Sequence, residues 1–267
     1  APHAQDGAPR EFPPAARHET LFADATIPPA LGGSEPDYLR QPKFLHDSES
    51  RARWKPRFST PGKYQATVKD YLRLITGVDE MVGAIVARLA ERNHLDDTIF
   101  VVIGDNGFFL GERGFADKWY MYEESIRVPL LICDPRVAPQ ARGRVEPALA
   151  LNIDVAPTIY QLLGLNIPAG VQGRSLEPFL SNEDVTTWRD RFFYEHLFKH
   201  AKIPPSEGVR TERWAYIRWI GETPAYEELF DLQNDPHEQT NLAGDPQHAA
   251  TLTEMRAQWE TLRREAE

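Results

Sequence analysis

Cysteine is nearly absent from this chain of 267 residues: Cys133 is the only one, which excludes a disulfide within the chain. No apolar run approaches the length that spans a membrane, and no secretory signal sequence is recognisable. Basic residues are outnumbered, with 30 Lys and Arg against 40 Asp and Glu, so the formal net charge is −10. An acidic chain of this kind does not favour binding to nucleic acid or to an anionic membrane.

The rest of the composition is that of a globular protein. Hydrophobic residues make up 41% and aromatic residues 10%, which is enough to bury a core. The length suits one large domain or a domain with a small appendage. We place the boundary near residue 184, with an α/β unit over residues 1–184 and a smaller α+β unit over residues 185–267.

The first third of the chain changes character at Pro61. Residues 1–60 are rich in proline, which predicts an extended, irregular segment over a surface. From Pro61 to just before Asn93, apolar residues recur every three or four positions. This spacing predicts one long amphipathic helix, bent near Gly77, whose apolar stripe packs on a sheet.

The middle of the chain has the pattern of an α/β fold. The β-branched runs at residues 99–103 and 128–132 are typical of buried strands in a mainly parallel sheet. A further short strand is predicted at residues 148–152, followed by a helix at 154–163. A helix that leads directly into a strand is the usual sign of this fold class.

The C-terminal unit alternates like antiparallel β-structure over residues 192–197, 208–220 and 226–232, and it ends in a helix over residues 246–265. The predicted fold class is therefore α/β: a partial, mainly parallel sheet flanked by helices, plus a small C-terminal antiparallel sheet with a terminal helix.

The sequence Asp105-Asn106-Gly107 follows the first predicted strand directly, where open α/β sheets usually bind ligands. A carboxylate and a carboxamide offer hard oxygens, which favour Ca²⁺ or Mg²⁺ over Zn²⁺. Gly107 would let the backbone turn sharply beside the ion. The same three residues are also a common turn sequence, so on spacing alone a plain turn is the competing interpretation.

The residues that follow carry a resemblance to a known family. They are, in order, Gly111-Glu112, Gly114, Asp117-Lys118 and residues 121–130 (MYEESIRVPL). In that order and spacing they resemble the type I, formylglycine-dependent sulfatases of the alkaline-phosphatase superfamily. One position departs from the family pattern, since Arg113 stands where the family often has His.

The resemblance implies that Asp105 and Asn106 are two ligands of a single divalent cation, usually calcium, with magnesium as the alternative. It also implies that Lys118 touches the sulfate oxygens. A sulfate ester gathers negative charge on its oxygens in the transition state, so a cation and an ammonium placed there lower the barrier. For Lys118 the competing interpretation is a solvated surface lysine.

The first four residues, Ala-Pro-His-Ala, resemble the family segment Lys-x-Pro-His-x-Pro. Ala1 would then follow that lysine, and His3 would be the active-site histidine that contacts sulfate or protonates a leaving oxygen. An exposed histidine near a chain end is the alternative. For selectivity, the residues of interest are Arg113 and the loop 199–208.

The family also has an Asp-Asp metal pair and a Cys/Ser-x-Pro-x-Arg motif whose Cys or Ser becomes formylglycine. Neither is found here: Cys133-Asp134-Pro135-Arg136 has its arginine one residue early, and Ser59-Thr60-Pro61-Gly62-Lys63 has lysine instead. The expectation is that the chain is the C-terminal portion of a sulfatase, with the nucleophile in an N-terminal part outside it, and that it is inactive and binds calcium weakly on its own.

Three functions remain open. The favoured one is a sulfuric ester hydrolase that acts on a sulfated small molecule or carbohydrate, periplasmic or secreted by family resemblance. A phosphodiesterase or phosphonate hydrolase of the same superfamily is the second, although such enzymes more often place His beside the metal-binding Asp. The third is a non-catalytic, sulfatase-like remnant or interaction module. The expected partner is the missing N-terminal half or a second copy of the chain, because exposed sheet edges and core would otherwise favour poor solubility.

Overall fold

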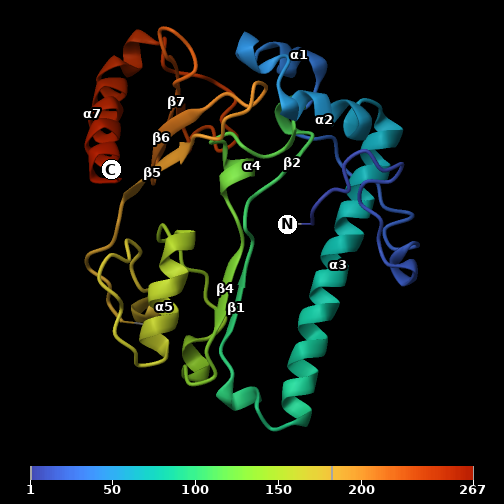
Figure 1. Ribbon diagram of the computed structural model, residues 1–267, viewed down its shortest axis with the longest axis vertical. Helices are drawn as coiled ribbons and strands as arrows, with labels where there is room; N and C mark the ends of the chain where they lie inside the picture. Colours follow the sequence, from blue (N-terminus) through green and yellow to red (C-terminus); the bar gives the residue numbers. More distant parts are fainter. Residues whose placement is uncertain (1, 182, 267) are drawn as a thin grey trace.

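The computed structural model describes residues 2–181 and 183–266. In Figure 1 the long helix α3 stands on one side, strands β1 and β4 run beside each other in the middle, and α5 lies on the other side. Helices α1 and α2 and the C-terminal sheet with α7 lie at the upper end. Ala1, which the sequence places next to a family lysine, lies outside the described residues.

The N-terminal sixty residues are more structured than their proline content predicts. They contain the short 3₁₀ helices η1 (Ala16–His18) and η2 (Lys43–Leu45) and the α-helices α1 (Glu35–Leu39) and α2 (Glu49–Phe58). Ser48 begins α2, and its side chain accepts a hydrogen bond from the backbone N–H of Arg51. Pro56 lies inside α2. The expectation of an irregular segment is therefore wrong for residues 49–58, where a serine cap is followed by charged residues with good helix propensity.

Helix α3 (Pro61–Glu91) has the predicted extent. Thr60 caps it by accepting a hydrogen bond from the Lys63 N–H, and Pro61 occupies the first turn, where its missing N–H costs nothing. The predicted packing of its stripe on a sheet is not observed, because apolar side chains along its second half are 42–56% exposed: Ile75, Val78, Met81 and Ile85.

Strands β1 (Phe100–Ile103) and β4 (Leu130–Cys133) pair antiparallel, with Phe100 opposite Cys133 and Ile103 opposite Leu130. The expectation of parallel pairing is wrong for these two strands. The chain leaves β1 and re-enters β4 at the same end, where the Gly104 N–H donates to the Pro129 carbonyl at 3.1 Å. A parallel pair would need a crossover to the opposite end of the sheet, and the only α-helix in between, α4 (Glu123–Ile126), has a single turn.

The segment between β1 and β4 contains a small hairpin. Strand β2 (Phe109–Leu110) pairs with β3 (Ala116–Asp117), and the 3₁₀ turn η4 (Glu112–Gly114) connects them. The connection from α3 to β1 is the 3₁₀ turn η3 (Leu95–Asp97).

After β4 come η5 (Pro139–Ala141), η6 (Asn152–Asp154), α5 (Val155–Leu162) and α6 (Glu177–Leu180). Residues 148–152 do not form the predicted strand. Asp154 explains this: its buried carboxylate accepts hydrogen bonds from the backbone N–H groups of Leu151 and Arg174, which holds the chain in a turn rather than in a ladder.

The C-terminal sheet is antiparallel in the order β5-β6-β7-β8, as predicted. Its strands are β5 (Arg191–His196), β6 (Ser206–Thr211), β7 (Trp214–Trp219) and β8 (Tyr226–Asp231). The predicted strand 208–220 is two strands, because a turn at Glu212 and Arg213 reverses the chain. The 3₁₀ turn η7 (Pro246–His248) and helix α7 (Ala249–Ala266) close the unit.

Two hydrophobic clusters fix the C-terminal sheet on both of its faces. One joins the sheet to the segment after β3, with Tyr120, Met121 and Tyr122 completely buried against Trp219 and Phe230. The other packs α7 on the opposite face through its buried residues Leu252 and Met255. The first cluster ties the residues that follow Lys118 to the C-terminal unit.

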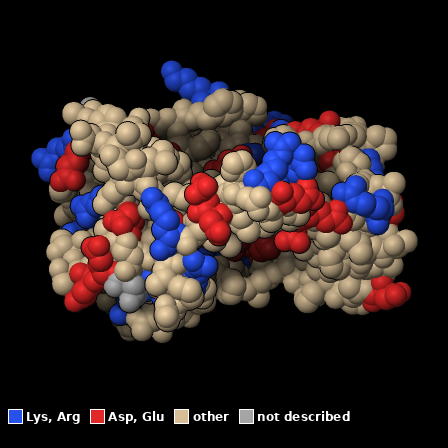
Figure 2. Space-filling view, turned by 90° about the horizontal axis from the view of Figure 1, so that it is seen from below, with Lys and Arg blue, Asp and Glu red and all other residues tan. Residues whose placement is uncertain are grey.

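Within the two described ranges, no helix is long and apolar enough to cross a membrane. The face seen in Figure 2 carries acidic and basic side chains interspersed.

Candidate active site

The Asp105-Asn106-Gly107 turn projects from the end of β1. Asp105 is exposed, and its Oδ1 accepts a hydrogen bond from the backbone N–H of Asn106 at 3.0 Å. The Asn106 side chain donates through Nδ2 to the Gly107 carbonyl at 2.6 Å. This contact fixes the amide, and within the described residues Asn106 Oδ1 accepts no hydrogen bond.

Gly107 is needed for a close approach rather than for an unusual turn, since its φ is not positive. Its N–H donates to the Ser125 carbonyl at 2.8 Å, and the next N–H, of Phe108, donates to the Glu124 carbonyl at 2.7 Å. A Cβ at Gly107 would lie 2.2 Å from the Glu124 carbonyl oxygen. The turn is thus clamped directly on the backbone of α4.

We expect Gly107→Ala to lower the free energy of unfolding by about 1–3 kcal/mol, because the methyl group has to push α4 away. Urea unfolding followed by circular dichroism measures the change. The matched control is Gly83→Ala on α3, where a Cβ would meet nothing within 4 Å and the better helix former should stabilise the protein by about 0.5–1 kcal/mol. Equal stability of Gly107→Ala and the unmodified protein would contradict the close approach.

Lys118 is half-buried in an unusual stretch of backbone. Its neighbours Asp117 and Trp119 both have positive φ values, +67° and +93°, which are rare for residues other than glycine. In the part of the chain that the structure describes, the Lys118 ammonium makes no hydrogen bond and no ion pair. The Lys118 ammonium therefore has no pairing carboxylate among the described residues, although the backbone on both sides of it has an unusual conformation.

Asp117 itself is buried, with 3% of its surface exposed. Its Oδ2 accepts from Arg53 Nη1 at 2.9 Å and from Arg57 Nη1 at 3.0 Å. Both arginines come from α2, and sequence reasoning missed them because residues 1–60 were interpreted as irregular. The signal was present in their spacing, four residues apart on what is a helix.

His3 is exposed, and its Nδ1 lies 2.8 Å from the Ala4 carbonyl. The segment that carries it is anchored by Phe12, which is 1% exposed. The Phe12 ring packs edge-on against Phe108, the residue after the Asp-Asn-Gly turn, with ring centroids 5.9 Å apart. The N-terminal segment therefore lies beside the predicted metal-binding turn.

Asp105 and Asn106 are the type of ligand that calcium or magnesium prefers, but two residues are too few to hold the ion. Their oxygens are hard ligands, and Asn106 Oδ1 is available, whereas Ca²⁺ takes six to eight oxygens. Over residues 2–181 and 183–266, no group of three or more His, Cys, Asp or Glu side chains is arranged to hold a metal ion. Their assignment as ligands stays a prediction, as do the roles of His3 and Lys118.

Arg113 is buried, which favours a structural role over the predicted part in selectivity. Its side chain is 2% exposed, and it donates to the carbonyls of His237 and Glu238, each at 2.8 Å. It also pairs with the carboxylates of Glu124 at 3.5 Å and Glu238 at 3.3 Å. This contact could not be predicted from the sequence, because its two partners are about 125 residues apart.

The loop 199–208 is exposed only in its first part. Ile203 is buried in the core, and Ser206 and Gly208 belong to the buried strand β6. Residues 199–202 are exposed, and Pro204 and Pro205 are half-buried.

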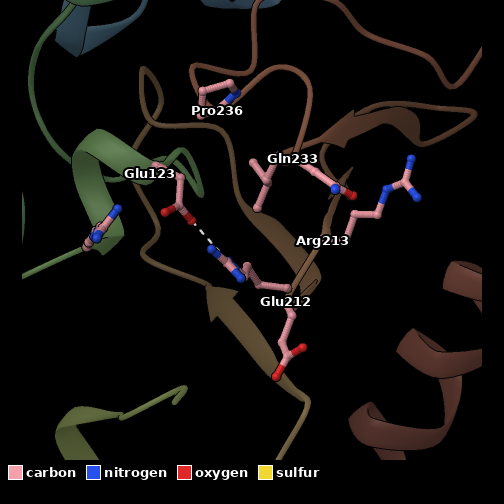
Figure 3. A pocket seen from close by; sticks show the side chains of 8 residues that line it. Glu123, Glu212, Arg213, Gln233 and Pro236 are labelled. Atoms are coloured by element: carbon pink, nitrogen blue, oxygen red, sulfur yellow. Dashed lines mark hydrogen bonds and ion pairs between the residues drawn. The ribbon is translucent and has the colours of Figure 1, made fainter. Parts of the chain in front are cut away.

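A surface pocket of about 420 Å³ opens between α4 and the C-terminal sheet (Figure 3). Glu123 reaches across it to Arg210, with the Glu123 Oε1 and Arg210 Nε atoms 3.1 Å apart. Arg213, also in its lining, pairs with Asp231 at 2.6 Å. These pairs favour a structural role for both arginines, and no predicted site residue lines the pocket.

Two family models match this chain. The model described as Sulfatase matches residues 5–165, and the model described as N-sulphoglucosamine sulphohydrolase, C-terminal, matches residues 111–265. The second model covers the Lys118 segment together with the whole C-terminal sheet.

Among curated proteins, the chain is 36% identical over 198 residues to N-acetylglucosamine-6-O-sulfatase of Bacteroides thetaiotaomicron, covering 72% of this chain and 35% of that protein. It is 31% identical over 229 residues to the multifunctional alkaline phosphatase superfamily protein PehA of Trinickia caryophylli, covering 81% of this chain and 43% of that protein. The chain thus spans less than half the length of these relatives.

Two solved structures superpose with a TM-score of 0.83. One is a protein in complex with its substrate D-glucosamine-2-N,6-O-disulfate, with 26% identity and coverage of 96% of this chain and 63% of that chain. The other is the phosphonate monoester hydrolase of Silicibacter pomeroyi, with 30% identity and coverage of 99% and 54%. These likenesses confirm the α/β class, and with the family models they show that this chain belongs to the sulfatase family of the alkaline phosphatase superfamily.

Proposed function

We propose that this chain is part of a sulfatase that releases sulfate from sulfated sugars, with a nucleophile contributed from outside the chain. The observation that carries the proposal is the match to the Sulfatase family model over the segment that holds Asp105, Asn106 and Lys118. The sugar is proposed from two relatives, one named for N-acetylglucosamine 6-sulfate and one solved with a glucosamine disulfate. A location outside the cytoplasm belongs to the same proposal.

Each predicted residue has a distinct task in this reaction. Lys118, charged and without a partner among the described residues, contacts sulfate oxygens and stabilises the charge that grows on them. Asp105 and Asn106 would hold a divalent cation, which when bound supplies further positive charge to the same oxygens. His3, which is exposed on the segment that Phe12 packs against Phe108, exchanges a proton with the leaving alcohol oxygen. A formylglycine outside this chain would supply the nucleophile.

The test begins with the coding DNA upstream of residue 1, read in frame for an Asp-Asp pair and a Cys/Ser-x-Pro-x-Arg motif. The full-length protein that this DNA encodes is produced together with a formylglycine-generating enzyme. It is then assayed for sulfate release from N-acetylglucosamine 6-sulfate. We expect turnover, and we expect Lys118→Ala to lower kcat/KM by about 10²–10³-fold. Lys43→Ala, an exposed lysine of η2, serves as the control. Robust turnover by the 267-residue chain alone would contradict the external nucleophile.

A second candidate is a phosphonate monoester hydrolase, favoured by the superposition on the Silicibacter pomeroyi enzyme over 99% of this chain. The same preparation is therefore also assayed with a phenyl phosphonate monoester. A higher kcat/KM for the phosphonate than for the sulfated sugar would favour this candidate. If the full-length protein turns over neither ester, the non-catalytic, sulfatase-like remnant is the interpretation that remains.

A further inference from the structure

Arg53 and Arg57 lie one turn apart on the same face of α2, and this face looks toward the candidate active site. The side chain of Arg57 is 3% exposed and that of Arg53 is 27% exposed. Burying a guanidinium is costly unless carboxylates pair with it, so the carboxylates around these arginines are informative. Glu49 of the same helix pairs with Arg53 Nε at 2.9 Å. The other carboxylates come from two segments that are distant in sequence.

The first of these segments carries Lys118. Asp117 accepts from both arginines through a single oxygen, Oδ2, at 2.9 and 3.0 Å. The Arg53 guanidinium also lies 5.2 Å from the centre of the Trp119 ring. The residues on either side of Lys118 are thus both in contact with the arginine pair.

The second segment carries His3. Asp6 pairs with Arg53 Nη1 through Oδ2 and with Arg57 Nη2 through Oδ1, each at 2.8 Å. Glu11 pairs with Arg57 Nε. The segment closes on itself through the hydrogen bond from the Gln5 N–H to the Glu11 carbonyl, at 2.8 Å.

One nitrogen joins the two segments. Arg53 Nη1 is within 2.9 Å of a carboxylate oxygen of Asp6 and of one of Asp117. Two carboxylates this close would repel each other without the guanidinium groups between them. The N-terminal segment is therefore held against the Lys118 segment by the two arginines of α2.

The backbone around Lys118 needs such support. Positive φ at a residue other than glycine costs of the order of 1–3 kcal/mol, and Asp117 and Trp119 both have it. Buried ion pairs at Asp117 can hold this conformation against its cost. Besides the arginine contact, Trp119 is held through its carbonyl, which accepts from the Tyr194 hydroxyl at 3.4 Å.

We propose that Arg53 and Arg57 are positioning residues that cross-link the His3 segment to the Lys118 segment and so fix the relative placement of these two side chains. The catalytic consequence of this placement rests on the proposed function, whereas the cross-link itself does not.

Hydrogen–deuterium exchange of the backbone tests the cross-link without any turnover. In Arg57→Lys, which keeps the charge but loses the forked geometry, we expect amides in both segments 4–12 and 115–120 to exchange at least tenfold faster. In Asp6→Asn only segment 4–12 should respond, and in Asp117→Asn only segment 115–120.

Arg189→Lys is the matched control, because Arg189 forms an equally buried ion pair with Asp154 but contacts neither segment. A response of only one segment in Arg57→Lys, or an equal response of both segments in Arg189→Lys, would overturn the proposal. If Arg57→Lys does not fold, the more exposed Arg53→Lys gives the same two-segment comparison.

Steady-state kinetics of the full-length protein, measured by sulfate release, test the consequence for catalysis. We expect Arg57→Lys to lower kcat at least tenfold while KM for the sulfate ester changes by less than threefold, because the site is still formed but misaligned. A loss confined to KM would overturn the positioning role. If the full-length protein releases no sulfate, the proposed function is refuted. The hydrogen–deuterium exchange experiment then still shows whether the two arginines cross-link the two segments.

Discussion

Replacement of Arg113 by alanine is expected to lower the free energy of unfolding by about 3–5 kcal/mol, the usual cost of removing one partner from a buried charge cluster. Arg113 lies between the carboxyl groups of Glu124 and Glu238, and its guanidinium lies 4.0 Å from the centre of the Tyr122 ring. Without it, the Glu124 carboxylate loses its nearby positive charge, and the carbonyls of His237 and Glu238 each lose a donor.

Urea unfolding at pH 7 measures this loss. Arg127→Ala is the control, since Arg127 is exposed on the same segment and makes no ion pair within the described ranges, so its change should stay within about 0.5 kcal/mol. A loss below 1 kcal/mol for Arg113→Ala would mean that this arginine is replaceable by solvent, which its burial contradicts.

The second large effect concerns pH. Burial raises the pKa of Glu238 from 4.5 to about 8, and the nearby Arg113 only partly offsets this rise. The unfolded chain releases this proton near pH 4.5, whereas the folded protein keeps it until about pH 8. The stabilising contribution of the protonated Glu238 is therefore complete below pH 4.5 and is lost as pH rises toward 8, at up to about 1.4 kcal/mol per pH unit.

Glu238→Gln isolates this contribution, because the amide resembles the protonated acid and cannot titrate. We expect the variant to gain stability relative to the unmodified protein as pH increases from 5 to 8, by several kcal/mol at most. Burial also raises the pKa values of Glu112 and Glu228, but these groups titrate in both proteins and cancel from the difference. A difference that does not change between pH 5 and 8 would show that Glu238 is ionised throughout.

The sequence was informative wherever the signal is local. Helix α3 could be predicted from its spacing and its Thr60-Pro61 start, and the C-terminal sheet from alternation.

The direction of β4 and the burial of Arg113 and Arg57 were missed because they depend on contacts between distant segments. The direction of β4 relative to β1 depends on where the intervening chain returns, which strand composition does not encode. The burial of Arg113 depends on Glu238, and that of Arg57 on Glu11 and Asp117. A charged residue next to a catalytic motif can be a ligand contact or a buried cross-link, and only its partners distinguish the two.

The exposed apolar stripe on α3, from Ile75 to Ile85, divides this helix into two halves of different character. The first half is held by Val68 in a buried cluster and by the ion pair of the buried Asp70 with Arg10 of the N-terminal segment. In the second half, Glu80 pairs with Arg17 at 2.6 Å and with the buried His18 at 2.7 Å. After Glu80, the described side chains of the helix make no hydrogen bond to another segment, and isolated helical turns are only marginally stable in water. The rigidity of these last turns therefore depends on their surroundings: an apolar surface laid along Met81 and Ile85 would stiffen them, and in water they fray more readily than the rest of the helix.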